Sequence, residues 1–86
     1  MTINPKYRLK KVGGKSIIIS QNSLNFEGIL TLNDTGEFIW QMIEKGAETG
    51  GIVTALAAEC NVSEDEIKDE VFDFIENLKK ANIVFD

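Results

Sequence analysis

The chain has 86 residues, of which 43% are hydrophobic and 27% charged, which fits a single domain, residues 1–86, with one core. Its net charge of -5 is unevenly spread: residues 1–26 hold five cations and no acid, and residues 27–86 hold all 14 acids and four lysines. A lone cysteine, the lack of a long apolar run and the lack of a signal peptide together predict a cytoplasmic protein with no membrane segment.

The first third of the chain predicts three antiparallel strands. Tyr7–Val12 alternates between apolar and charged residues, and Ser16–Ser20 carries a β-branched run that suits a strand. Gly13-Gly14 between them supplies the positive φ angles of a tight hairpin turn. A polar connection, Gln21–Asn25, leads to a third alternating segment, Phe26–Leu32.

The apolar period becomes helical after Asn33. Asp34 is the predicted N-cap of the first helix, with Glu37 three residues later, and Gly46 is its predicted stop. Apolar residues at helical spacing predict the buried face of this helix: Phe38, Ile39, Trp40, Met42 and Ile43.

Two further helices follow. The second begins near Thr49 and ends at Asn61, a residue suited to a left-handed cap. The third begins with a capping box, Ser63 and Glu66, and ends near Lys79 and Lys80. One apolar face runs along it at helical spacing, with Ile67, Val71, Phe74, Ile75 and Leu78.

The residues Ile83–Phe85 then indicate a short terminal strand or a packed tail. The predicted fold is therefore an α+β, winged-helix-like domain, with a three-stranded antiparallel sheet followed by three helices.

Side chains for catalysis are scarce. The sequence has no histidine, which excludes histidine-based triads and histidine metal sites, and Cys60 alone cannot form a thiolate zinc site. Neither glycine pair fits a phosphate-binding loop. We expect no enzymatic activity, no metal and no cofactor.

Helices two and three also resemble a helix-turn-helix, so a winged helix-turn-helix DNA-binding protein is the alternative. The first half of the third helix carries five acids and a single cation, Lys68, which opposes an approach to phosphates. We therefore expect no nucleic-acid partner. A structural subunit that only stabilises a larger enzyme is a third possibility.

The segment Leu32–Trp40 reads L-N-D-T-G-E-F-I-W and resembles the L-N-x-T-G-x-x-I-W signature of PqqD-like proteins, coenzyme PQQ synthesis protein D. The similarity extends from about Tyr7 to Phe85. It implies a recognition element for the leader of a ribosomally made, post-translationally modified peptide, a peptide chaperone that presents the precursor to a modifying enzyme. In this family that enzyme is often a radical SAM protein, and monomers or dimers are both compatible with the sequence.

The resemblance further implies where the leader lies: along the edge of the third strand and in the groove between that strand and helix three. It implies peptide contacts from two segments, with Gly28, Ile29, Leu30 and Thr31 on the strand and Lys68, Val71, Phe72, Ile75 and Lys79 on the helix. Because two lysines edge this helical stripe, an acidic leader is expected.

Overall fold

The structure, a computed structural model, describes residues 1–20 and 28–86. The elements in chain order are β1 (Thr2–Ile3), β2 (Tyr7–Val12), β3 (Lys15–Ser20), β4 (Gly28–Leu32), α1 (Asp34–Glu44), α2 (Thr49–Cys60), α3 (Glu64–Lys80) and β5 (Val84–Phe85). This order confirms the predicted α+β fold in which a three-stranded sheet precedes three helices.

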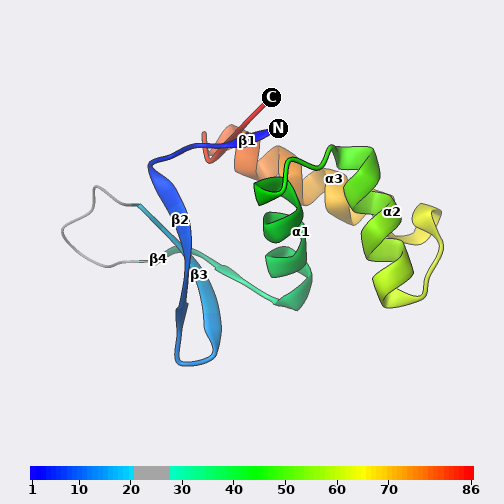
Figure 1. The fold of residues 1–86 in the computed structure, drawn as a ribbon, viewed down its shortest axis with the longest axis horizontal. Coiled ribbons are helices and arrows are strands. Elements are labelled where there is room, and N and C mark those ends of the chain that lie inside the picture. The colour runs from blue at the N-terminus through cyan, green and yellow to red at the C-terminus, as the bar shows by residue number, and fades with distance from the viewer. Residues whose placement is uncertain (21–27) are drawn as a thin grey trace.

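The three-stranded sheet has the order β2-β3-β4 and is antiparallel throughout (Figure 1). Gly13 and Gly14 have φ values of 56° and 79°, which confirms the tight turn predicted between β2 and β3. Along β4, Ile18 pairs with Leu30 and Ile19 with Gly28, so one extra residue forms a bulge in this strand. The predicted connection Gln21–Asn25, and the start of the predicted third strand, lie outside the described residues.

The helices begin and end close to the predicted positions, with one correction. The side chain of Asn33, and not that of Asp34, caps α1, since its Oδ1 accepts a hydrogen bond from the backbone N–H of Gly36 at 2.8 Å. Asp34 is instead the first helical residue, where its charge favours the positive end of the helix dipole. The predicted stop of this helix is confirmed by Gly46, which has a φ of 87°.

The other two helices match their predicted caps. Asn61 adopts the left-handed conformation after α2, with a φ of 56°. Ser63 Oγ accepts a hydrogen bond from the backbone N–H of Glu66 at 3.3 Å and so caps α3. Gly50 and Gly51 are part of α2, although glycine is a poor helix former.

The core lies where the three helices meet each other and the sheet. Its largest fully buried side chains come from β3 and from all three helices: Trp40, Ile18, Ile39, Ile52, Leu56, Leu78 and Val71, together with Val84 of β5. Because Ile39 and Trp40 are 1% and 0% exposed, the predicted core positions of the Leu32–Trp40 segment are confirmed.

The two ends of the chain pair with each other, which the sequence does not predict. Thr2 pairs with Phe85 and Ile3 with Val84 in a small antiparallel sheet, β1-β5, so the N- and C-termini lie side by side beyond the helices (Figure 1). A strand of two residues has no periodicity that sequence reasoning could detect. The described helices include none long and apolar enough to cross a membrane.

Candidate functional site

The candidate site begins at the open edge of β4. This strand pairs with β3 on one side, and within the described residues no strand pairs with its other side. Such an edge presents backbone N–H and C=O groups that can accept a further strand. Side-chain chemistry beside this edge therefore decides which extended segment could bind there.

An apolar cavity of ≈ 220 Å³ lies between β4 and the second half of α3. Its lining consists of Leu30, Phe74, Asn77, Leu78, Ala81 and Ile83. The lining contains no charged residue and its single polar side chain is the amide of Asn77. This cavity can therefore hold an aliphatic or aromatic side chain.

A second, more polar cavity of ≈ 350 Å³ lies nearer the start of α3, beside the first turn of α1. Its lining consists of Thr31, Leu32, Asn33, Thr35, Gly36, Ile39, Glu70 and Phe74. The half-buried side chain of Phe74 lines both cavities, so the apolar and the polar cavity lie on either side of it along β4 and α3. We call the two cavities together the β4–α3 groove.

The start of α1 gives the groove its depth. A Cβ atom on Gly36 would lie 3.1 Å from the Phe74 ring and 3.3 Å from Leu32 Cδ2. An added Cβ would therefore require the ring to move by a few tenths of an ångström from its place against the first turn of α1. The Leu32–Trp40 segment thus positions the groove as well as the core, through the contact between Gly36 and Phe74.

An ion pair fastens the β2–β3 hairpin to the same turn of α1. Lys11 Nζ lies 2.8 Å from Glu37 Oε1. The hydrogen bond from Lys11, with a further one from Ser16, lowers the pKa of the Glu37 carboxyl, and the same bond to Glu37 raises the pKa of Lys11. Ser16 is 4% exposed, so its contact with Glu37 is buried between the sheet and α1. Together with the Lys11–Glu37 pair it fixes the position of the hairpin against this helix.

The four predicted strand residues all belong to β4. Thr31 is exposed and lines the polar cavity, and Leu30 is half-buried and lines the apolar one. Gly28 pairs with Ile19 and Ile29 falls at the bulge, so both belong to the backbone of the open edge. Their contact with a peptide stays a prediction.

The five predicted helix residues lie elsewhere on α3 than in the lining of either cavity. Val71 and Ile75 are 0% and 2% exposed, because they point into the core and support the groove from beneath. Phe72 is 51% exposed, but it stands two residues from Phe74 and so on nearly the opposite side of the helix.

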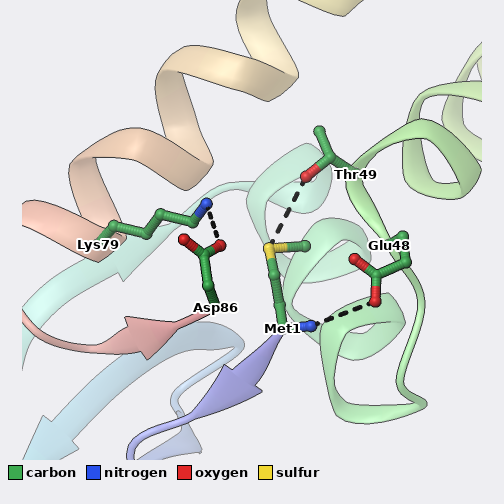
Figure 2. A network of polar contacts seen from close by, with 5 residues as sticks. All are labelled: Met1, Glu48, Thr49, Lys79 and Asp86. Atoms are coloured by element: carbon green, nitrogen blue, oxygen red, sulfur yellow. Dashed lines mark hydrogen bonds and ion pairs between the residues drawn. The ribbon is translucent and has the colours of Figure 1, made fainter.

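Both predicted lysines are engaged in ion pairs away from the groove. Lys68 Nζ lies 3.3 Å from Asp65 Oδ1, and Lys79 Nζ lies 2.6 Å from Asp86 Oδ1. The hydrogen bond between the second pair raises the pKa of Lys79 and lowers that of Asp86. Lys79 belongs to the polar network where the two chain ends meet the start of α2 (Figure 2).

This network around the chain ends is structural. The Met1 amine lies 3.5 Å from Glu48 Oε1, and Thr49 Oγ1 donates a hydrogen bond to Met1 Sδ at 3.8 Å. Figure 2 shows these contacts beside the Lys79–Asp86 pair, so the network joins β1, β5, α3 and the start of α2. None of its five residues lines the β4–α3 groove.

Sequence reasoning missed the residues of α3 and its C-cap that line the groove, which are Glu70, Phe74, Asn77, Leu78 and Ala81. Their spacing of four, three, one and three residues marks one helix face, but the adjacent core stripe has nearly the same pattern. The apolar pattern of this helix predicts Phe74 on the core face, and it predicts no role for Glu70. Gly36 is the signal that could have distinguished the groove face from the core face, because a residue without a side chain leaves space for a large neighbour.

Within the described ranges, no cluster of three or more potential metal-ligating side chains is present, and the free Cys60 is exposed. The sheet edge beside the groove is an arrangement that suits binding of an extended chain.

Comparisons with known proteins agree with this geometry. Residues 23–84 match the family described as coenzyme PQQ synthesis protein D (PqqD). Among solved structures, TbiB1 in complex with the TbiA(beta) leader peptide is similar, with a TM-score of 0.78 and 20% identity over 96% of this chain and 93% of that one. At that identity the likeness concerns the fold. No curated protein sequence matches the chain.

Proposed function

Because this chain belongs to the coenzyme PQQ synthesis protein D (PqqD) family, we propose that it binds the leader segment of a ribosomally made precursor peptide and presents that precursor to a modifying enzyme. The observation that carries the proposal is the open edge of β4 beside the β4–α3 groove. A peptide added to this edge gains backbone hydrogen bonds from β4 and side-chain contacts from α3.

The similarity to TbiB1 supports this proposal, since that protein was solved with a leader peptide bound. In the described part of the chain the core is buried without a peptide, and side chains cap the N-termini of α1 and α3. The open edge can therefore stand ready for a segment supplied by another chain. In this proposal the chain is a peptide chaperone without catalysis of its own, and a radical SAM protein as its enzyme partner stays a prediction.

DNA binding is not favoured. The acids of α3 are solvent-exposed along the helix that would have to enter a major groove, including Glu66, Asp69 and Asp73. Carboxylates in that position repel phosphates, whereas affinity for duplex DNA depends on cations that replace counterions.

The test is a calorimetric titration with the short precursor peptide encoded beside this chain's gene, followed by amide hydrogen exchange on the complex. We expect binding, with new protection along Gly28–Leu32 and unchanged exchange along the opposite sheet edge, Tyr7–Val12. Binding that leaves β4 unprotected would move the site, and absence of binding by any neighbouring precursor would refute the function.

A further inference from the structure

The β4–α3 groove carries a single formal charge among the side chains that line its two cavities, and that charge is the carboxylate of Glu70. Glu70 is exposed, and among the described residues it makes no hydrogen bond or ion pair. The polar side chains around it, Thr31, Asn33 and Thr35, are neutral. The polar half of the groove therefore offers an unneutralised carboxylate to whatever lies in it.

We propose that Glu70 is a specificity-determining residue that selects a leader with lysine or arginine at one defined position, two residues from an apolar anchor. This inference rests on the proposed function. It reverses the expectation of an acidic leader, which depended on Lys68 and Lys79, because both of these lysines lie outside the groove and are paired with acids.

The spacing follows from the positions of the two cavities along α3. Along α3 and its C-cap, the apolar cavity is lined by Phe74, Asn77, Leu78 and Ala81, and the polar one by Glu70 and Phe74. Their centres are thus separated by about five residues, or roughly 8 Å at the rise of an α-helix. Side chains on one face of a strand repeat about every 7 Å, so the two cavities accept residues i and i+2.

The order of the two residues follows from the direction of β4. Leu30 lines the apolar cavity, whereas Thr31 and Leu32 line the polar one, so β4 runs from the apolar half to the polar half. A peptide antiparallel to β4 runs the opposite way and meets Glu70 first. The predicted motif is cation-x-apolar for an antiparallel leader, and apolar-x-cation for a parallel one.

The apolar residue and the cation have separate roles in this scheme. The apolar side chain fills the ≈ 220 Å³ cavity, which contains no charge and supplies most of the burial. The cation approaches a carboxylate between the Phe74 ring and the start of α1, where the peptide excludes part of the water. The carboxylate of Glu70 therefore determines which of several apolar peptides binds best, whereas the apolar side chain supplies most of the affinity.

The test is a selection of linear 12-residue peptides from a random displayed library against the wild-type chain and against Glu70→Lys. The control is Glu76→Lys, which makes the same charge change at an exposed residue of α3 outside both cavities. Thermal unfolding of the three proteins checks that each is folded. Peptides enriched on the wild-type chain are then synthesised with lysine, glutamine or glutamate at the variable position, and their affinities are measured.

We expect the wild-type chain and Glu76→Lys to enrich an apolar residue with lysine or arginine two positions away, and Glu70→Lys to enrich an acid there. With synthetic peptides, exchanging lysine for glutamate should weaken binding to the wild type roughly three- to tenfold, less at high salt, and strengthen binding to Glu70→Lys. Apolar consensus peptides with no charge preference would overturn the role of Glu70 but keep the proposed function. If the wild type enriches no peptide, the proposed function itself fails, and this inference with it.

Discussion

Gly36 and Phe74 lie in direct contact: a side chain on the glycine would place its Cβ 3.1 Å from the Phe74 ring, closer than ordinary packing allows. This contact joins the first turn of α1 to the middle of α3 and sets the position of the ring that lines both cavities of the β4–α3 groove. It connects the most specific sequence segment of the chain with the candidate site.

The first prediction concerns this contact. Gly36→Ala should destabilise the domain by about 1–3 kcal/mol, since the added methyl group overpacks the space beneath Phe74. The matched control is Gly51→Ala in α2, where an added Cβ meets nothing within 4 Å. Gly51→Ala should stabilise the domain by about 0.5–1 kcal/mol, because alanine has a higher helix propensity than glycine. Urea unfolding of both variants measures the difference, and equal effects would contradict the contact.

The second prediction concerns Trp40, which is 0% exposed and whose indole Nε1 has no hydrogen-bond partner within the described residues. Trp40→Ala should destabilise by about 3–5 kcal/mol, as expected for a large buried aromatic side chain. Trp40→Phe should cost distinctly less, because it keeps most of the ring volume and removes an unpaired buried donor that costs about 1–3 kcal/mol.

Chemical denaturation followed by circular dichroism measures both tryptophan variants, since neither retains the only tryptophan of the chain as a fluorescence probe. Equal losses for Trp40→Phe and Trp40→Ala would contradict this prediction.

The third prediction concerns pH. The pKa of Glu37 in the folded chain is below its ordinary value of 4.5, so its bond with Lys11 contributes stability above that value and loses it as pH falls through the lowered pKa. Lys11 has a raised pKa, so its contribution persists up to its ordinary value of 10.5 and is lost as pH rises through the raised pKa. Wild type should therefore exceed Glu37→Gln in melting temperature at pH 7.

The difference between wild type and Glu37→Gln should shrink as the pH is lowered below about 4.5 in a series of thermal melts. Glu44→Gln is the control, because Glu44 is an exposed acid of the same helix with no ion pair within the described residues. A difference that stayed constant down to pH 2 would show that charge on Glu37 is unimportant.

Most of the fold could be predicted from sequence because its signals are local. The Gly13-Gly14 turn, the Ser63 cap and the helical period of α3 each depend on neighbouring residues. Asn33 and Asp34 show the limit: both are good caps, and only the geometry of the entering chain selects Asn33. The β1-β5 pairing depends on contact between the two chain ends, which no local pattern contains.

The peptide site predicted from the sequence and the β4–α3 groove share β4 and α3, but they lie on different sides of that helix. The faces toward the core and toward the groove are adjacent on α3, and a helical wheel cannot show where β4 lies beside it. Phe72 has an exposed ring and Phe74 a half-buried one, and their roles depend on the crossing of α3 past β4. That crossing is set by long-range packing, including the space left by Gly36.

The last prediction separates these two placements of the peptide. Asn77→Trp should project a large side chain into the apolar cavity and reduce the affinity for peptides selected on the wild type by tenfold or more. The free energy of unfolding should change by less than about 1 kcal/mol, because Asn77 is exposed.

Phe72→Ala is the comparison: the sequence-based site predicts a loss of about 1–3 kcal/mol in binding, as at a contact hot spot. Since Phe72 lies outside the lining of both cavities, we expect the affinity of the Phe72→Ala protein for the peptide to stay within about twofold of the wild type. Calorimetric titration of one peptide into all three proteins, with urea unfolding in parallel, decides between them. Strong binding by Asn77→Trp and weak binding by folded Phe72→Ala would place the peptide on the outer face of α3 and refute the groove.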